Sequence, residues 1–250
     1  MIPKLSIVIP AWEMDEEKGR LIRNCVESIK QHTDVTHELI IVDNGSTVAK
    51  DFMRDSSDIC IVNRENLGFA AAINQGFRLA RGKHVAFMND DIVVGQSWAS
   101  HMVRMSELGV IVMPAVMRPE LIQEGETFAQ SIQRTQDERK WHPQYGDCDP
   151  FPELDGWGSL FMGRRDVFQR VQDQYGELMS EEYRYTMFDD RDLWLRLCLM
   201  GVRNVRTHKV WVHHVGNATW GKIPNQERIY LENEAIYREK VARLWTKGHS

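Results

Sequence analysis

The sequence predicts a single α/β domain with a mostly parallel central sheet flanked by helices. Over roughly the first 110 residues, short apolar runs alternate with longer segments of helical period, which is typical of β-α-β units. The length of 250 residues suits one sizeable core and is short for two full domains. Two apolar runs end in clusters of polar residues, at the place where open α/β sheets put their ligands.

The first half is expected to contain four strands and two helices. The apolar runs predict strands at Leu5 to Ile9, Leu39 to Val42, Ile59 to Val62 and Val85 to Met88. A stripe of apolar residues predicts a helix from about Glu16 to Gln31, through Leu21, Ile22, Cys25, Val26 and Ile29. A second stripe predicts another helix, through Phe69, Ile73, Phe77 and Ala80.

The second half begins with a predicted strand at Gly109 to Met113 and then changes character. Five of the eight prolines fall between positions 114 and 152, which predicts an irregular connection. Regular structure is expected to return with a strand at Gly158 to Met162, a helix at Phe188 to Met200, a short strand at Val210 to His213 and a closing helix at Glu227 to Trp245.

The composition narrows the classes of partner. The net charge is -5, with 31 basic and 36 acidic residues well mixed, so no overall field favours nucleic acid or an anionic membrane. No apolar stretch approaches the ~20 residues needed to span a bilayer, so we expect a soluble, cytoplasmic chain. The four cysteines are scattered without a C-x-x-C pair, and we expect reduced thiols rather than a disulfide framework or a zinc site.

The most informative string is VAFMNDD, in which an apolar run leads directly into Asn89, Asp90 and Asp91. Adjacent carboxylates repel each other unless a cation or solvent lies between them. Mg²⁺ and Mn²⁺ prefer such oxygen ligands and often bind through one or two carboxylates, with substrate phosphate oxygens completing the shell. The string therefore predicts a divalent metal site with a phosphate-bearing ligand. The alternative is a solvated acidic turn.

Seven strings in order resemble the family 2 inverting glycosyltransferases of GT-A fold, particularly their rhamnosyltransferase-like branch. They are LSIVIPAW, IVDNGST, NLGFAAAINQGF, VAFMNDD, GWGSLFMGR, FDDRDLWLRL and WVHHVGNAT, and they cover roughly residues 4 to 220. The resemblance implies the GT-A fold, a UDP- or dTDP-sugar donor, and Mn²⁺ or Mg²⁺. We accordingly divide the single domain into a nucleotide-sugar-binding half (1–113), an acceptor-binding half (114–224) and a C-terminal helix (225–250).

The resemblance assigns the donor nucleotide to the ends of the first two strands. Asp43 would accept hydrogen bonds from the N–H edge of uracil or thymine, and the Pro10-Ala11-Trp12 turn would provide a wall for the base. The alternative is that Asp43 starts an Asx turn or caps the next helix. Asn66 and Gly68 match a segment that brings backbone close to the ligand before a helix, although Asn66 would serve an ordinary helix cap equally well.

The same resemblance assigns metal and donor contacts around the NDD string. Asp91 matches the direct metal ligand, Asp90 would accept from hydroxyl groups of the donor, and Asn89 replaces the first acidic residue of the family pattern. His214 matches a histidine that ligates the metal or contacts the donor phosphate. Neighbouring strand residues face opposite ways, so His213 and His214 compete for this role, and we favour His214. A buried structural histidine is the alternative for either.

The string FDDRDLWLRL matches the element that carries the general base. An inverting transfer needs a carboxylate to take the proton of the acceptor hydroxyl, and Asp190 matches that position, with Asp189 in place of the usual Glu. Asp192 is expected to orient the helix that follows. The alternative is an acidic helix N-terminus stabilised by the helix dipole.

The acceptor side is assigned to aromatic residues of the second half. Trp157 beside Gly158 matches the place where the family builds this side, and a planar ring is a good platform for a sugar. Trp141, Tyr145 and Trp220 are further candidates to line the groove, with core packing as the alternative for each. Asn74 sits among apolar neighbours in its helix and needs a partner, which is either a loop backbone or a ligand.

The sequence therefore predicts a metal-dependent inverting glycosyltransferase acting on an acceptor hydroxyl, with a polysaccharide or other glycan first. A protein or a modified nucleic-acid base is the alternative acceptor, although nucleic acid is not indicated. A different phosphate-handling metalloenzyme is a second alternative, but the chain lacks the P-loop and D-x-D-x-[TV] patterns. A sugar-nucleotide-binding module without catalysis is a third. A lipid-linked acceptor would be reached by peripheral membrane contact. The sequence does not specify the oligomeric state.

Overall fold

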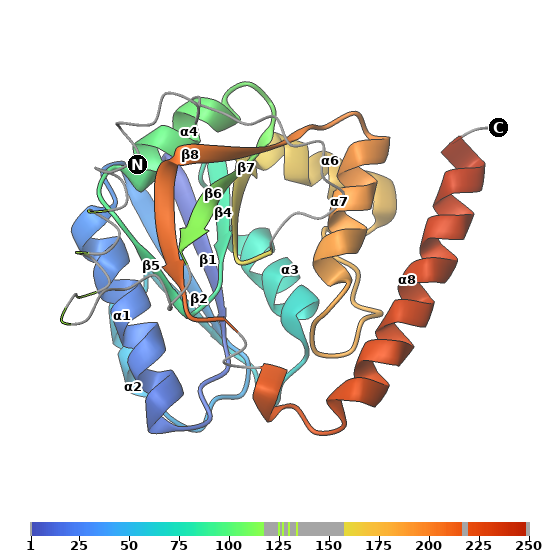
Figure 1. The fold of residues 1–250 in the computed structure, drawn as a ribbon. Helices are drawn as coiled ribbons and strands as arrows, with labels where there is room; N and C mark the ends of the chain where they lie inside the picture. Colours follow the sequence, from blue (N-terminus) through green and yellow to red (C-terminus); the bar gives the residue numbers. More distant parts are fainter. Residues whose placement is uncertain are drawn as a thin grey trace.

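A computed structural model describes residues 2–117, 125, 127, 130, 134, 158–216 and 220–248, with side chains described as far as residue 244. Its centre is one mixed sheet of eight strands in the order β3-β2-β1-β4-β7-β6-β8-β5 (Figure 1). The strands are β1 (Leu5–Ala11), β2 (His37–Asp43), β3 (Ile59–Val62), β4 (His84–Met88), β5 (Ile92–Val94), β6 (Ile111–Met117), β7 (Leu160–Arg164) and β8 (Asn204–His214).

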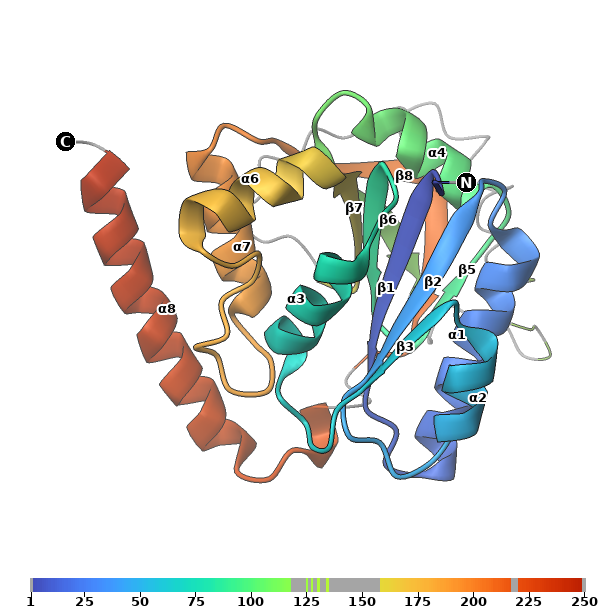
Figure 2. The same ribbon diagram turned by 180° about the vertical axis from the view of Figure 1, so that it is seen from behind.

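Helices cover both faces of this sheet (Figure 2). One face is buried by α1 (Glu16–His32), α2 (Lys50–Ser56) and α4 (Trp98–Ser106). The other is buried by α3 (Phe69–Leu79), α6 (Arg165–Tyr175) and α7 (Asp189–Leu199). A final helix, α8 (Gln226–Gly248), contacts α7 and lies along its outer side, away from the sheet (Figure 1). None of the helices in the described part of the chain is long and apolar enough to cross a membrane.

The predicted elements of the first half are present, and their apolar stripes face the core. In α1 the side chains of Ile22, Cys25, Val26 and Ile29 are fully buried, and Asp15 caps the helix by accepting from the Lys18 N–H at 3.0 Å. In α3 the stripe of Ile73 and Phe77 is buried in the same way. Pattern and packing therefore agree where the hydrophobic period is strong.

The pairing of the sheet is more mixed than the sequence predicts. The pairings β1·β2, β1·β4, β2·β3 and β6·β8 are parallel. The pairings β4·β7, β5·β8 and β6·β7 are antiparallel. The β-α-β pattern that suggests a parallel sheet belongs to the first half only, and β5 and β7 bring the antiparallel pairs.

Several element boundaries also differ from the prediction. The irregular connection does not begin at Pro114, because β6 continues to Met117 with a register shift between Pro114 and Ala115. A proline has no N–H for the ladder, and a register shift is a place where a strand tolerates one. The β8 strand begins at Asn204, six residues before the predicted Val210. The short elements α2 and β5, and the helices α4 and α6, were not predicted.

The Pro10-Ala11-Trp12 segment, predicted as a turn against the base, is mostly strand. Pro10 and Ala11 are the last two residues of β1 and pair with Val42 and Asp43 of β2, so only Trp12 lies beyond the strand end. Pro10 lies outside the stretch of β1 that pairs with β4, which stops at Val8, and a residue without an N–H is tolerated there. Ala11 is 2% exposed and belongs to the core, whereas Trp12 is half-buried.

Candidate active site

The polar clusters predicted from the sequence meet at one edge of the sheet. Strands β1, β2 and β4 are parallel neighbours, so Asp43 at the end of β2 and Asn89 after β4 lie at the same edge. Strand β7 is antiparallel to β4 and therefore begins there, and the Asn89 N–H donates to the Ser159 carbonyl at 2.8 Å. Segments from both halves of the chain thus form this edge.

Asp91 and His214 lie in contact at this edge. The His214 Nε2 is 3.3 Å from Asp91 Oδ1, and the other oxygen of Asp91 accepts from the Gly216 N–H at 2.9 Å. Burial raises the pKa of Asp91, but His214 and the Gly216 N–H outweigh it and leave the pKa below its usual value. The Asp91 carboxylate is therefore ionised at neutral pH and carries the negative charge of this corner.

His213 occupies the opposite side of β8. Its side chain is fully buried, whereas that of His214 is 17% exposed. Burial, followed by the neighbouring His214, lowers the pKa of His213 to about 4, so this ring is neutral. The alternation of strand side chains thus brings His214 to Asp91 and directs His213 into the core.

Asp90 has a partner that the sequence reasoning missed. Lys18 of α1 is 2% exposed and its Nζ lies 3.2 Å from Asp90 Oδ1. The lysine lies four residues before Ile22 and therefore on the same buried face of α1. This position in the sequence could have indicated that Lys18 is buried and needs a charged partner. The repulsion expected between Asp90 and Asp91 is therefore relieved in part by a protein cation.

Glu13 is a further buried acidic side chain beside Asp90. Its side chain is fully buried, and burial together with the negative charge of Asp90 raises the pKa of Glu13 to about 10. Glu13 is consequently protonated at neutral pH. The backbone of the residue joins two loops, because its N–H donates to Ser46 Oγ at 2.8 Å and its carbonyl accepts from the Thr47 N–H at 2.8 Å.

The donor set around Asp91 fits a divalent cation. Asn89 Oδ1 is a buried acceptor without a hydrogen-bond partner among the described residues, and the buried Asp91 Oδ1 contacts the His214 ring at 3.3 Å. A buried acceptor left in this state is costly, and a hard cation would satisfy it. Within the described ranges no group of three His, Cys, Asp or Glu side chains gathers to hold a metal. Two protein ligands are still enough for Mg²⁺ or Mn²⁺ when phosphate oxygens complete the shell.

The residues predicted to bind the nucleotide make hydrogen bonds within the protein, at the end of β2 and before the start of α3. Asp43 Oδ1 accepts from the Ser46 N–H, three residues further on, at 2.8 Å, so this oxygen closes a local turn as a cap does. Asn66 Oδ1 accepts from the Gly68 N–H at 2.9 Å and from Asn44 Nδ2 at 2.8 Å. Asn44, which was not predicted, also accepts from the Leu67 N–H at 3.0 Å and so fixes this loop to β2.

Asp189 and Asp190 begin α7 beside the start of β7. A Cβ added to Gly158 would lie 3.0 Å from both Cβ and Oδ2 of Asp190, so only a glycine allows this approach without displacement. Burial, followed by the charge of Asp190, raises the pKa of Asp189 to about 8, and burial also raises that of Asp190. Asp190 is half-buried, whereas Asp189 is 2% exposed, so Asp190 is the more exposed of the two residues.

A continuous set of contacts connects the two acidic clusters. Asn89 bonds to Ser159, and the adjacent Gly158 touches Asp190. The first half of the chain therefore brings Asp91, and the second half brings Asp190 and His214, to one edge of the sheet.

The remaining predicted residues have different outcomes. Asp192 is fully buried and pairs with Arg196 at 2.7 Å and with Lys240 at 3.7 Å, so it joins α7 to α8 rather than facing the edge. Asn74 donates to the Met179 carbonyl at 2.8 Å, which is the loop-backbone alternative. Trp220 is half-buried in a short 3-10 turn, Trp220–Lys222. The other aromatic candidates lie outside the described residues; they are Trp141, Tyr145 and Trp157.

Known proteins resemble the chain in sequence and in fold. A glycosyltransferase of Rickettsia prowazekii, RP339, is 25% identical over 203 residues, covering 78% of this chain and 58% of the relative. The undecaprenyl-phosphate 4-deoxy-4-formamido-L-arabinose transferase of Proteus mirabilis is 33% identical over 98 residues, covering 36% of this chain and 30% of the relative. The chain spans less than two thirds of the length of the curated relatives it matches.

The fold is that of the GT-A glycosyltransferases. The structure of GalNAc-T7 with UDP, GalNAc and Mn²⁺ superposes with a TM-score of 0.65 at 14% identity, covering 86% of this chain and 44% of that one. Residues 6–172, more than half of the 250, match the model of glycosyl transferase family 2. The chain therefore belongs to glycosyl transferase family 2.

Proposed function

We propose that the chain is a metal-dependent inverting glycosyltransferase that moves a sugar from a UDP- or dTDP-linked donor to an acceptor hydroxyl. The observation that carries this proposal is the meeting of Asp91 and His214 with Asp190 at one edge of the sheet, through the contacts of Asn89, Ser159 and Gly158. A transferase of this kind needs a site for the diphosphate and a base for the acceptor within reach of one sugar.

The nucleotide lies, in this proposal, over the carboxyl ends of β1, β2 and β4. Asp43 receives the N–H edge of the base, with Trp12 against its face and Asp90 toward hydroxyl groups of the donor. The other residues assigned to the donor are Pro10, Ala11, Asn66, Gly68 and Asn89. Because Asp43 Oδ1 already closes a turn, its second oxygen is the acceptor assigned to the base.

Asp91 and His214 would hold a Mn²⁺ or Mg²⁺ ion whose remaining positions are filled by diphosphate oxygens. Carboxylate and imidazole ligands suit Mn²⁺, and the unpartnered buried oxygen of Asn89 beside them supports a cation there. When bound, the ion supplies positive charge that stabilises the leaving nucleoside diphosphate. The structure of the GT-A neighbour with UDP and Mn²⁺ supports this assignment by analogy.

Asp190 acts as the general base in a single displacement. Its carboxylate takes the proton from the acceptor hydroxyl while that oxygen forms a bond to the anomeric carbon, and the bond from that carbon to the diphosphate oxygen breaks on the opposite face. The configuration of the sugar is inverted as a result. A raised pKa makes Asp190 a stronger base, and its neighbour Asp189 is protonated at neutral pH and lies on the acceptor side.

The acceptor is proposed to be a glycan, bound near Gly158 and Trp157 and presented to Asp190. The Proteus mirabilis relative is named as an undecaprenyl-phosphate 4-deoxy-4-formamido-L-arabinose transferase, which supports the transfer of a sugar. The rhamnosyltransferase-like resemblance of the motifs belongs to the same proposal, with polysaccharide biosynthesis as its setting.

The substitution Asp190→Asn tests the proposal. It keeps the shape of the side chain and removes the base, so transfer should fall by at least about 10²-fold while nucleotide diphosphate binding is retained. Because the pKa of Asp190 is raised, wild-type transfer should be lost on acidification at a pH above the ordinary Asp value of about 4. Near-wild-type transfer by Asp190→Asn would remove Asp190 from this role.

A further inference from the structure

The turn that leads into Asp190 has an unusual backbone. Tyr185, Met187 and Phe188 have φ angles of 62°, 80° and 69°, and none of them is a glycine. Residues with side chains rarely adopt this left-handed region, so the surrounding structure has to hold them in it. Phe188 is also the N-cap residue of α7, and its side chain makes no capping bond. The position of Asp190, two residues later, depends on this turn.

One buried side chain from α8 binds nearly the whole turn. Asn233 is 1% exposed, and its Oδ1 accepts from the Arg184 N–H at 3.0 Å. Its Nδ2 donates to the carbonyls of Arg184 at 3.0 Å, Thr186 at 2.8 Å and Met187 at 3.3 Å. Both polar atoms of the amide are therefore used on the backbone of residues 184–187.

The rest of the contact comes from the same face of α8 and from α3. The Phe188 ring lies 5.0 Å from the Tyr230 ring and 5.6 Å from the Tyr237 ring, and positions 230, 233 and 237 share one side of a helix. From the other direction, the Phe69 N–H of α3 donates to the Tyr185 carbonyl at 2.6 Å. The turn is thus fixed between α8 and α3.

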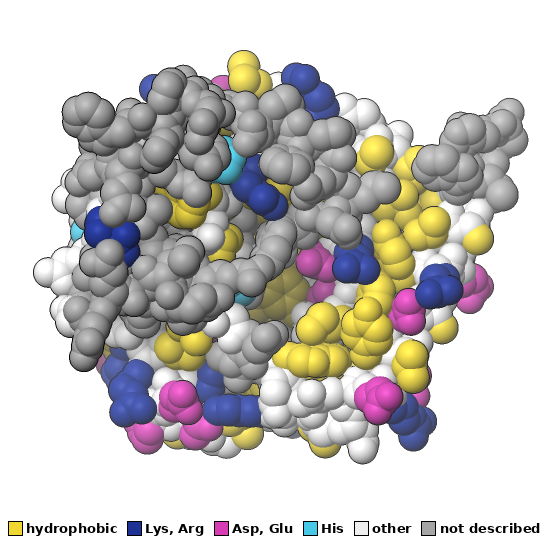
Figure 3. Space-filling view, in the orientation of Figure 1, with side chains coloured by type: hydrophobic (Ala, Val, Ile, Leu, Met, Phe, Trp, Pro, Cys, Tyr) yellow, Lys and Arg dark blue, Asp and Glu magenta, His cyan; other side chains and the backbone are white. Residues whose placement is uncertain are grey.

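The contact with this turn connects α8 to the residues beside Asp190. The helix does not cover the sheet, and apolar side chains gather on the side of the molecule where it lies (Figure 3). It also lies beyond residue 172, where the match to the family model ends. Two polar side chains of α8 are buried among the described residues, Asn233 and Lys240. Lys240 pairs with Asp192, and Asn233 binds the turn before Asp190.

We propose that Asn233 is a positioning residue for the transfer reaction, holding the Arg184–Phe188 turn so that the Asp190 carboxylate faces the acceptor hydroxyl. The inference rests on the proposed base role of Asp190. Asn233 does not touch the donor or the acceptor, and it acts through the backbone. Small displacements of a reacting group are costly to the rate, so loosening this turn should reduce kcat rather than nucleotide binding.

The test is Asn233→Asp, measured in the wild-type chain and in the Asp190→Asn chain. Aspartate keeps the size of the side chain and the acceptor for the Arg184 N–H, but it loses the donor to three carbonyls. We expect kcat to fall about tenfold or more, with the donor KM and the Kd for the nucleotide diphosphate changed by less than about twofold. In the Asp190→Asn chain the same substitution should have no further effect on residual transfer, because the group it positions is gone.

Asn74→Asp is a matched control. Asn74 is also buried, at 4% exposure, and its amide likewise bonds to loop backbone, with Met179 N–H donating to its Oδ1 at 3.0 Å. Met179 lies well before Asp190 in the chain, so any loss caused by Asn74→Asp should be the same in both backgrounds. This pair separates a loss of folded protein from a loss of positioning.

Wild-type kcat in folded Asn233→Asp, or an equal fold-loss in both backgrounds, would overturn the inference. If Asn233→Asp does not fold, Asn233→Ala replaces it, with the same expected and contradicting results. A failure of the proposed function would look different, because Asp190→Asn alone would then keep near-wild-type transfer.

Discussion

At the amino ends of β1, β2 and β4, the buried side chains of Ser6, Glu38 and His84 all bond to other protein groups. At the carboxyl ends of the same strands, the buried Asn89 Oδ1 has no hydrogen-bond partner among the residues described, and three buried acids, Glu13, Asp90 and Asp91, lie close together. Folded proteins satisfy most of their buried polar groups. The contrast therefore indicates which end of the sheet is built for stability and which end is built to receive a ligand.

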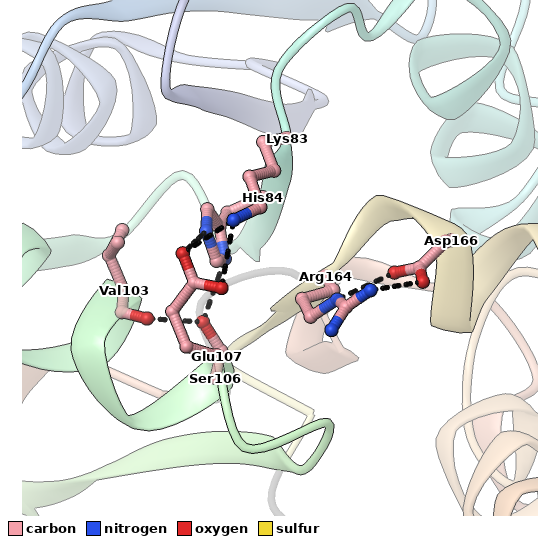
Figure 4. Close-up of polar contacts among 7 residues, drawn as sticks. All are labelled: Lys83, His84, Val103, Ser106, Glu107, Arg164 and Asp166. Carbon is pink, nitrogen blue, oxygen red and sulfur yellow. Dashed lines mark hydrogen bonds and ion pairs between the residues drawn. The ribbon is translucent and has the colours of Figure 1, made fainter.

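The amino end shows how complete such a network is in this molecule. Glu38 accepts from Ser6 Oγ at 2.6 Å, from the Arg81 N–H at 2.7 Å and from Arg81 Nε at 2.8 Å. His84 contacts Ser106 Oγ at 2.9 Å and Glu107 Oε1 at 3.2 Å, and Lys83 donates to the same glutamate (Figure 4). Burial lowers the pKa of His84 despite Glu107, so this edge holds a neutral ring in a closed network.

The largest effect at the carboxyl end is expected from Asp91→Asn. The amide retains the shape and an acceptor for the Gly216 N–H but lacks the charge that would hold a cation. Mn²⁺-dependent binding of the nucleotide diphosphate should weaken by about 100-fold or more, measured by calorimetry, with little change in thermal stability. If nucleotide diphosphate binding by the variant depended on Mn²⁺ as it does in the wild type, Asp91 would not be a metal ligand.

The opposite result is expected at the amino end from Glu38→Ala. Removing this carboxylate leaves the buried Ser6 hydroxyl and the Arg81 N–H without their acceptor, so the free energy of unfolding should fall by about 3 kcal/mol. Urea unfolding measures this loss, and nucleotide binding by the folded variant should match the wild type. Weakened nucleotide binding at full stability would contradict the division between the two ends.

A smaller, pH-dependent effect is expected from Glu13→Gln. The pKa of Glu13 is about 10 in the folded protein and about 4.5 when unfolded, so the unfolded state loses its proton first as pH rises. The contribution of Glu13 to the free energy of unfolding is fully present below pH ~4.5 and decreases as the pH rises to about 10. Glutamine resembles the protonated acid at every pH, so its contribution does not change.

Between pH 6 and pH 7 the wild type should therefore lose about 1 kcal/mol relative to Glu13→Gln, measured from urea unfolding at the two pH values. An equal pH dependence in both proteins would mean that Glu13 is ionised in the folded state.

The sequence predicted the elements with strong periodicity and the strand ends that carry NDD and VDNGS, because both signals are local. It also paired Asp91 with His214 through the motif order, and the structure places these side chains 3.3 Å apart. Lys18 and Asn233 escaped prediction because their roles depend on tertiary contacts. A lysine in the first turn of a helix resembles a solvated one, and Asn233 bonds to a turn that is 46 to 49 residues away in the chain.

Two of the elements that escaped prediction, α2 and β5, are short. The strand β5 has three residues and α2 has seven, which is too short for a hydrophobic period to be distinguished. The antiparallel pairs of β5 and β7 follow from long-range pairing that no local pattern encodes.

Calorimetric titration of UDP, dTDP, GDP and ADP, each with Mn²⁺ and with chelator, tests whether Asp91 and His214 hold a metal-bound nucleotide diphosphate. We expect binding confined to UDP or dTDP and dependent on Mn²⁺, because the diphosphate and the ion complete each other's coordination at Asp91 and His214. Binding that ignores the metal, or no binding of any of the four, would contradict this expectation and leave Asn89, Asp90 and Asp91 as an acidic turn at the end of β4.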